Sequence, residues 1–220
     1  MLPKVILHMG VSADGRYDWG ISTDSPYYEI IPSLNTDADL SGSGTIQRAF
    51  FPEDPEKVFP NEYGNRKLTR PLLAVIDSQG KILNWHLIKK QPWWSAHISF
   101  CSRSTPQDHI DYLQEQKVDY YLTGADRVDL KKALEVLSAR YGVQAVRVDS
   151  GGILNGVLLR AGLVDEVNIV VHPELVGGMT PKSMFVAPDL TSNEGVIPLK
   201  LLRAETIRDK YVWLKYMVIK

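Results

Sequence analysis

The sequence lacks several features that mark particular classes of protein. It contains one cysteine, Cys101, in 220 residues, so neither an intrachain disulfide nor a thiolate metal cluster can form. Its five histidines show no close ligand spacing, and the sequence therefore predicts no metal site. No apolar run approaches the roughly 20 residues that a membrane span needs, and the run after Met1 is too short for a signal peptide. We therefore expect a soluble, cytoplasmic protein without a membrane partner.

The sequence also lacks an excess of charge of either sign. Its 25 Lys and Arg residues are balanced by 26 Asp and Glu residues. A broad electrostatic attraction to nucleic acid needs a basic excess, so we expect no nucleic-acid partner. With 220 residues, 44% of them hydrophobic, the chain can bury a sizeable core in one α/β domain or in two small domains.

Strand-like and helix-like patterns alternate along the chain. Short β-branched runs predict strands, whereas apolar residues three or four apart predict helices. The predicted strands cover residues 5–9, a short run after 37, 70–76, 96–101, 118–122, 143–148, 164–171, 199–205 and 211–219. Helices are predicted after Pro26, near Thr45, from Pro106 through Glu115, up to Arg140 and before Gly162. This order, with a terminal antiparallel hairpin, predicts a single mixed-sheet α/β domain over residues 1–220.

Residues 49–69 form an irregular stretch in which aromatic side chains alternate with prolines and charges. Long connections without regular structure are uncommon in compact domains and often form lids or interfaces. The same stretch is equally compatible with an insertion that has no role.

A glycine pair, Gly151-Gly152, separates a predicted strand from a predicted helix. Such a pair lets backbone N–H groups approach an anion, and the helix dipole adds attraction. A plain tight turn explains the pair equally well. In the helix that follows, four apolar residues recur at helical spacing: Ile153, Val157, Leu158 and Ala161. Gly162 is placed to end that helix.

Three further strand ends carry candidate functional residues. Asp14 lies in a turn after the first strand, where it is either a reacting carboxylate or an ordinary turn former. Thr45 either caps a helix or offers its hydroxyl and N–H to a ligand. Ser102-Arg103-Ser104 combines a guanidinium with two hydroxyls, which suits a phosphate monoester. The same triplet is also compatible with a helix cap beside a solvated arginine.

Several of these stretches together resemble the reductase domain of riboflavin biosynthesis, a dihydrofolate-reductase-like family. The stretches that carry the resemblance are Ser12–Gly15, Gly42–Thr45, Leu73–Asp77, Val148–Glu166 and Pro173–Gly178. They follow the family's order over most of the chain, and the match is most specific from about Val143 to Gly178.

The chain departs from that family's pattern in two places. Asp149-Ser150 stands where the family usually has a glutamate and the first of three glycines. The family's His-x-x-Arg segment before the second strand is replaced by the stretch from Tyr27 to Thr36.

The resemblance implies a central mixed, mostly parallel sheet with flanking helices, a homodimer, and NADPH as hydride donor. By resemblance, the residues that hold the cofactor are Gly44, Thr45, Ser102, Arg103, Ser104, Gly151, Gly152, Ile153 and Leu154. The Ser102–Ser104 stretch is placed to bind the 2′-phosphate and so favours NADPH over NADH. Asp14 is implied as the catalytic residue, with Asp149 and Arg16 as substrate-binding residues.

The implied reaction is the NADPH-dependent transfer of hydride to C1′ of an aminopyrimidine ribosylamino 5′-phosphate. The missing His-x-x-Arg segment motivates an alternative, a reductase of the same fold that acts on another pteridine, pyrimidine or small carbonyl compound. A second alternative is a nucleotide-binding module without catalysis.

Overall fold

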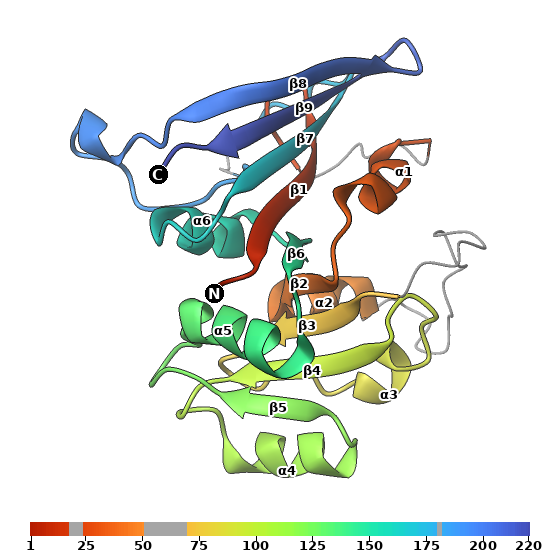
Figure 1. Cartoon of the computed structure of the whole chain (residues 1–220), viewed down its shortest axis with the longest axis vertical. Coiled ribbons are helices and arrows are strands. Elements are labelled where there is room, and N and C mark those ends of the chain that lie inside the picture. Colours follow the sequence, from red (N-terminus) through yellow and green to blue (C-terminus); the bar gives the residue numbers. More distant parts are fainter. Residues whose placement is uncertain (18–23, 51–69, 180–181) are drawn as a thin grey trace. The chain divides into compact units, whose positions relative to one another are not determined.

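A computed structural model describes residues 1–17, 24–50, 70–179 and 182–220 (Figure 1). Most of the irregular stretch at residues 49–69 lies outside the described residues, so its predicted role as a lid, interface or insertion stays a prediction. Its first two residues end a helix. None of the described helices is long and apolar enough to cross a membrane.

The described residues confirm the predicted alternation of strands and helices. The strands are β1 (Lys4–Ser12), β2 (Ala38–Gly42), β3 (Leu72–Ile76), β4 (Ala96–Cys101), β5 (Asp119–Leu122), β6 (Ala145–Val148), β7 (Glu166–His172), β8 (Leu199–Ile207) and β9 (Tyr211–Val218). The helices are α1 (Tyr27–Ile30), α2 (Ser43–Phe50), α3 (Trp85–Ile88), α4 (Gln107–Glu115), α5 (Leu130–Tyr141) and α6 (Gly152–Arg160), with 3₁₀ turns at Ile31–Leu34 and Asn193–Gly195.

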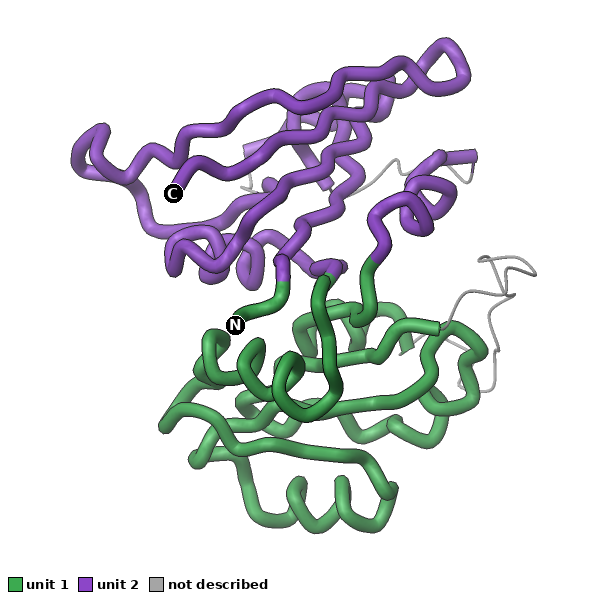
Figure 2. Tube along the Cα trace, in the orientation of Figure 1, with its two compact units in different colours: residues 1–3, 36–146 green, residues 4–35, 147–220 purple. Residues whose placement is uncertain are grey.

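The chain divides into two compact units (Figure 2). Unit 1 comprises Met1–Pro3 and Thr36–Val146, and unit 2 comprises Lys4–Asn35 and Arg147–Lys220. The division passes through β6, between Val146 and Arg147. A single domain over residues 1–220 stays a prediction.

Unit 1 is built on parallel strands in the order β5-β4-β3-β2. Its core brings residues of α2, α3 and α4 against β3 and the end of β4, with the Trp85 side chain fully buried among them. Figure 1 shows α5 in front of these strands in the view drawn. The side chains that α5 buries are Leu130, Ala133, Leu134 and Leu137, as its predicted apolar face requires.

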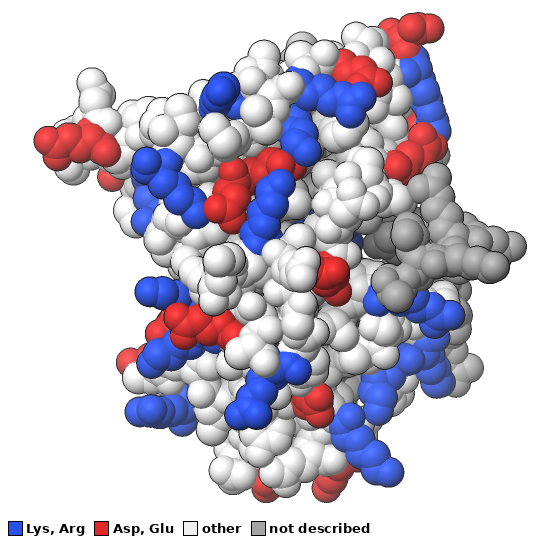
Figure 3. Space-filling view, in the orientation of Figure 1, with Lys and Arg blue, Asp and Glu red and all other residues white. Residues whose placement is uncertain are grey.

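Unit 2 contains β1, which pairs in parallel with β7, and the antiparallel strands β9 and β8 that follow β7 in the order β1-β7-β9-β8. Its core brings β1, α1, β7 and β9 together through Ile6, Ile30, Leu34, Val170, Tyr211 and Trp213. The predicted C-terminal hairpin is confirmed. Figure 3 shows acidic and basic side chains interspersed over the face in view, in keeping with the near balance of charge.

The predicted glycine loop between the second strand and its helix is wrong. Strand β2 ends at Gly42 and α2 begins at Ser43, so Gly44 and Thr45 both lie in the first turn of the helix. Thr45 is therefore not a helix cap.

Helix α6 ends as predicted, but the face that it buries differs from its apolar spacing. The Gly162 N–H donates to the Leu159 carbonyl and the Leu163 N–H to the Leu158 carbonyl, each at 3.0 Å, with Gly162 at φ +65°. This is the Schellman arrangement. Of the residues at helical spacing, Leu158 is buried, but Ile153 is 73% and Val157 51% exposed.

The tight turn between β8 and β9 offers a test of backbone strain. Arg208 and Asp209 both have positive φ, 52° and 55°, which is the conformation that a type I′ hairpin requires and that glycine adopts without strain. We expect Asp209→Gly to raise the free energy of unfolding by about 0.5–1 kcal/mol, measured by urea denaturation. A lower unfolding free energy in this variant would show that the Asp209 side chain stabilises the turn.

Candidate functional site

The candidate residues fall into two groups, one in each unit. Unit 1 contains Gly44, Thr45 and the Ser102–Ser104 stretch, whereas unit 2 contains the Asp14–Arg16 turn and the stretch from Asp149 to Leu154.

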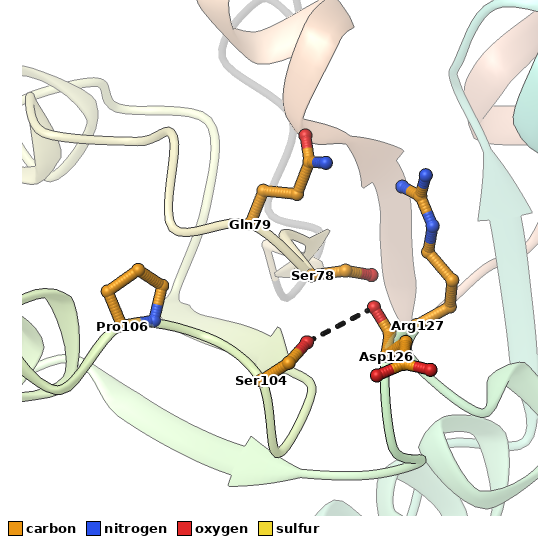
Figure 4. Close-up of a pocket in the computed structure, with 6 residues that line it drawn as sticks. All are labelled: Ser78, Gln79, Ser104, Pro106, Asp126 and Arg127. Atoms are coloured by element: carbon orange, nitrogen blue, oxygen red, sulfur yellow. Dashed lines mark hydrogen bonds between the residues drawn. The ribbon is translucent and has the colours of Figure 1, made fainter.

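A pocket of about 400 Å³ lies in unit 1 (Figure 4). Its lining comes from the segments that follow three neighbouring parallel strands: Ser78 and Gln79 after β3, Ser104 and Pro106 after β4, and Asp126 and Arg127 after β5. The carboxyl ends of parallel strands are where α/β sheets bind ligands.

Hydroxyl groups tie the three lining segments together. The hydroxyls of Ser102 and Thr105 each donate to the Ser78 carbonyl at 2.9 Å, and the Ser78 hydroxyl accepts from the Val128 N–H at 3.0 Å. The Ser104 hydroxyl donates to the Asp126 carbonyl at 3.4 Å (Figure 4). These bonds hold together the three loops that line the pocket.

Of the three residues predicted to bind the 2′-phosphate, only Ser104 lines this pocket. Ser102 is fully buried, and its hydroxyl bonds within the protein. Arg103 is exposed and does not belong to the lining, where the arginine is Arg127. Sequence reasoning missed Arg127 and Gln79, although both follow strand ends and the same strand-end argument could have found them.

A buried pair, Asp77 and His109, stabilises the turn that carries Ser78 and Gln79. The Asp77 carboxylate is fully buried and accepts hydrogen bonds from the N–H groups of Lys81 and Ile82, each at 2.9 Å. His109 Nε2 lies 3.6 Å from Asp77 Oδ2, and burial lowers the pKa of His109. Gly80, at φ +66°, packs so closely on the His109 ring that a Cβ would lie 2.7 Å from His109 Cγ. The turn that carries Ser78 and Gln79 is thus held by hydrogen bonds to Asp77 and by packing on His109.

In unit 2, the Asp14 carboxylate binds the loop after β7, which contains a second glycine pair, Gly177-Gly178. Its Oδ1 accepts from the Ser12 hydroxyl at 2.5 Å and from the Val176 N–H at 3.1 Å, and its Oδ2 accepts from the Gly177 N–H at 2.7 Å. The Ser12 hydroxyl first, and then the N–H groups of Gly177 and Val176, lower the pKa of Asp14 to about 2. The catalytic role of Asp14 stays a prediction, but its geometry shows a carboxylate that organises a loop.

Arg16 contacts the same loop. Its Nη1 donates to the Gly178 carbonyl at 3.3 Å, and its backbone forms an isolated antiparallel bridge with Ser183. The substrate-binding role of Arg16 stays a prediction.

The contacts of Asp14 should make the stability of the protein depend on pH in the acid range. A lowered pKa in the folded state means that the carboxylate stabilises the fold above its ordinary pKa of 3.8, and that this contribution is lost as the pH falls toward about 2. We expect Asp14→Asn to be less stable than the wild type at neutral pH, and the difference to shrink between pH 3.8 and about 2. Urea unfolding over this pH range measures it.

Asp189→Asn is the matched control, because Asp189 is an exposed carboxylate for which the described residues provide no hydrogen bond. Its stability should differ little from the wild type at every pH. A difference between Asp14→Asn and the wild type that stays constant down to pH 2 would contradict the ionised, loop-holding carboxylate.

The glycines of α6 meet a neighbouring segment of unit 2. A Cβ at Gly152 would overlap the Ser183 carbonyl oxygen, and a Cβ at Gly156 would overlap that of Val186. The Val186 N–H donates to the Gly152 carbonyl at 3.0 Å, and Asn155 Nδ2 donates to the Met184 carbonyl at 2.9 Å. Gly152 is therefore required for chain packing, whatever it does toward a phosphate. A bulky substitution at Gly152 would disturb the fold and cannot by itself test cofactor binding.

Asp149 lies between two side chains of unit 2. Arg147 Nη1 donates to its Oδ2 at 2.9 Å, and the Tyr27 hydroxyl donates to its Oδ1 at 3.0 Å. Gly151 is the N-cap of α6. The predicted contacts of Gly151, Gly152, Ile153 and Leu154 with a cofactor, and of Asp149 with a substrate, stay predictions. Among the described residues, no group of His, Cys, Asp and Glu could hold a metal ion.

Comparison with known proteins gives a consistent result. Residues 3–213 match the model of the RibD C-terminal domain family. The chain is 29% identical over 222 residues to the 2,5-diamino-6-ribosylamino-4(3H)-pyrimidinone 5′-phosphate reductase of Methanothermobacter thermautotrophicus, with 96% of this chain and 97% of that protein covered.

Solved structures show the same fold. RibD of Acinetobacter baumannii superposes with a TM-score of 0.75 at 20% identity, covering 99% of this chain and 58% of that longer chain. A pyrimidine reductase-like protein of Corynebacterium diphtheriae gives a TM-score of 0.73 at 17% identity, covering 99% and 92% of the two chains. The α/β class with a mostly parallel mixed sheet, flanking helices and C-terminal antiparallel strands is thus confirmed. Because the family model matches nearly the whole length, the chain belongs to the RibD C-terminal domain family.

Proposed function

We propose that this protein is the reductase of riboflavin biosynthesis that reduces a 2,5-diamino-6-ribosylamino-4(3H)-pyrimidinone 5′-phosphate, with NADPH as hydride donor. The observation that carries the proposal is the likeness to the Methanothermobacter enzyme of that name over 97% of that enzyme's length. The family match over residues 3–213 supports an oxidoreductase of this pathway over a nucleotide-binding module without catalysis.

The proposed reaction opens the ribose ring of the substrate. A hydride adds to C1′, the bond between C1′ and the ring oxygen breaks, and that oxygen takes up a proton, which leaves a ribityl chain and NADP⁺. NADPH supplies the hydride when bound, and the protein supplies binding, orientation and electrostatics.

The pocket of unit 1 fits the phosphorylated adenosine end of such a cofactor. Its lining offers the Arg127 guanidinium, the Gln79 amide and the Ser78 and Ser104 hydroxyls, and arginine with hydroxyl donors is a common way to bind a phosphate monoester. We propose Arg127 and Ser104 as the residues that contact the 2′-phosphate, which favours NADPH over NADH. Arg103, Gly44 and Thr45 remain candidates of unit 1 that contact other parts of the cofactor.

In unit 2, we propose that the N-terminus of α6, from Gly151 to Leu154, contacts the pyrophosphate. The backbone N–H groups of a helix N-terminus attract anions, and α6 is nine residues long. Asp149 and Arg16 are proposed to contact the substrate. We propose that Asp14 contributes to substrate binding indirectly, by holding the loop that contains Gly177, and not as a free carboxylate.

The experiment that tests the function follows NADPH oxidation by the purified protein with the pyrimidinone phosphate as substrate, and identifies the ribityl product by mass spectrometry. Turnover with NADPH and formation of that product are the expected result. NADPH binding without turnover of this substrate would overturn the proposal and favour a reductase of another pyrimidine, pteridine or small carbonyl compound.

We also propose that the protein is a homodimer of the cytoplasm. Strand β8 is exposed along nearly its whole length, and it presents Leu199, Leu201 and Leu202 at 42–53% exposure. An exposed edge strand with apolar side chains is a surface suited to association. Sedimentation equilibrium should give twice the chain mass of 24.7 kDa, and a monomer at all concentrations tested would contradict this assignment.

A further inference from the structure

Four polar side chains of unit 2 form a cluster, and one of them is a carboxylate. They are His8 of β1, Tyr27 of α1, Arg147 of β6 and Asp149, which follows β6. His8 and Arg147 are 0% and 1% exposed and Tyr27 is 9% exposed, whereas the Asp149 side chain is 40% exposed. Two buried side chains, Arg147 and Tyr27, thus bind a carboxylate that reaches the surface, and buried His8 packs against Tyr27.

The two oxygens of that carboxylate are held from different directions. Arg147 donates to Oδ2 at 2.9 Å. The Tyr27 hydroxyl shares its single proton between Oδ1 at 3.0 Å and the His8 carbonyl at 3.1 Å. Tyr27 is itself fixed, because its ring stacks on the His8 ring at 4.2 Å and its carbonyl lies 2.9 Å from His8 Nε2. The plane of the Asp149 carboxylate is therefore set by groups that cannot move freely.

The charges in the cluster follow from its burial. Burial, followed by the nearby Arg147 charge, lowers the pKa of His8 to about 4, so the His8 ring is neutral at neutral pH. Burial, followed by the Asp149 charge, raises the pKa of Tyr27 well above 10, so its hydroxyl keeps its proton and remains a donor. Arg147 is the cation of the cluster and Asp149 its counter-ion.

A buried arginine is a costly residue at this strand position. Its neighbours in β6, Val146 and Val148, are both fully buried and face the opposite side of the strand. A strand that is buried on both faces usually carries apolar residues throughout. Burying an ion pair gives little or no stability over apolar packing of similar volume, because the desolvation of the charges offsets their attraction. Arg147 therefore calls for an explanation other than stability.

We propose that Arg147 and Tyr27 are positioning residues that hold Asp149 as a fixed acceptor for an amino or hydroxyl group of the pyrimidine substrate. The inference rests on the proposed function, since the substrate's amino groups and ribose hydroxyls are the donors that such an acceptor binds. A carboxylate has about four lone-pair sites, so an oxygen bonded from inside the protein can also accept from a ligand. The cofactor contacts proposed in unit 1 and at the N-terminus of α6 do not use the side chains of Arg147, Tyr27 or Asp149.

The test compares Arg147→Met, Arg147→Lys and Tyr27→Phe with Tyr28→Phe as the control. Tyr28 is the neighbouring tyrosine, 46% exposed, and its ring packs edge-on against the Tyr27 ring at 5.1 Å. Phenylalanine at position 28 keeps this ring contact and removes only the hydroxyl. For each protein, kcat, the KM of the pyrimidinone phosphate, the KM of NADPH and the melting temperature are measured. Methionine keeps the length of the side chain without its charge, and the Asp149 carboxylate left behind can still reach solvent.

We expect Arg147→Met to raise the KM of the pyrimidinone phosphate about tenfold or more, the range of a charge-assisted hydrogen bond. The KM of NADPH should stay within about twofold. The melting temperature should fall only slightly, because the Asp149 carboxylate that loses its partner is 40% exposed and still accepts from the Tyr27 hydroxyl. Tyr27→Phe should raise the substrate KM by about three- to tenfold, Arg147→Lys should restore part of the loss, and Tyr28→Phe should match the wild type.

A substrate KM that is unchanged in both Arg147→Met and Tyr27→Phe would overturn the inference. So would a parallel rise in both KM values together with a much lower melting temperature, which indicates a structural role. If Arg147→Met does not fold, Tyr27→Phe and Arg147→Lys decide. If the wild type binds the pyrimidinone phosphate in calorimetry but does not reduce it, the proposed reaction fails, and calorimetric affinities of the same variants decide the inference.

Discussion

Gly156→Ala is expected to lower the free energy of unfolding by about 3 kcal/mol, near the upper end of the usual cost of overpacking. The added Cβ would overlap the carbonyl oxygen of Val186 and crowd its carbonyl carbon. Backbone atoms cannot relieve an overlap by a change of rotamer, as a long side chain can. The segment from Ser183 to Val186 must therefore move away from the helix. That movement also breaks the bonds from the Val186 N–H to the Gly152 carbonyl and from Asn155 to the Met184 carbonyl. Urea denaturation measures the loss.

Gly44→Ala is the matched control for this substitution. Gly44 is also a helical glycine, in the first turn of α2, but a Cβ there would meet no atom within 4 Å. Alanine is favoured over glycine in a helix by about 0.5–1 kcal/mol, so the control should be as stable as the wild type or slightly more stable. Equal losses of stability in both variants would mean that helix geometry, and not the contact with Val186, sets the cost at Gly156.

Gly152 and Gly156 show which features of α6 the sequence could not predict. The strand, glycine turn, helix and C-terminal Gly162 are local features, and local periodicity and end signals predicted them. The contact of Gly152 and Gly156 with residues 183–186 joins a helix to an irregular segment far along the chain. No periodicity marks such a segment, so the sequence suggested only two local explanations of the glycine pair, a phosphate-binding turn and a plain tight turn.

The contact with residues 183–186 also explains which residues of α6 are exposed. Apolar spacing identified Ile153 and Val157, yet both are more than half exposed, while Asn155 and Gly156 are buried. Hydrophobic spacing identifies the buried face only when apolar side chains do the packing. Here the close approach of a backbone segment requires small and hydrogen-bonding residues instead.

The contacts of Asp14 and the lining of the unit 1 pocket could be predicted only in part. A turn after the first strand was a sound place to expect a functional carboxylate, but the N–H groups that bind Asp14 belong to Val176 and Gly177, on the loop after β7. The strand-end rule identified Ser102–Ser104 after β4. The pocket also draws on the ends of β3 and β5, and which residue of each loop faces inward depends on hydrogen bonds between the loops.

Arg127→Ala is expected to raise the KM of NADPH by about 10- to 100-fold, the effect of losing a charge-assisted bond of roughly 1.5–3 kcal/mol. Arg127 lines the pocket beside Ser104, and a guanidinium is a suitable donor for a phosphate monoester. The KM of NADH, which lacks the 2′-phosphate, should change by no more than about threefold, and so should kcat. Steady-state kinetics with both nucleotides measure the change.

Arg103→Ala is the variant that makes this test decisive. Arg103 is two residues beyond the end of β4 and exposed, but it lies outside the pocket lining. If the pocket binds the 2′-phosphate, the KM of NADPH should respond strongly at Arg127 and weakly at Arg103. The opposite order would restore the sequence-based assignment of Arg103 and remove the pocket from the cofactor site. Equal and small effects on NADPH and NADH in both variants would show that neither arginine distinguishes the two nucleotides.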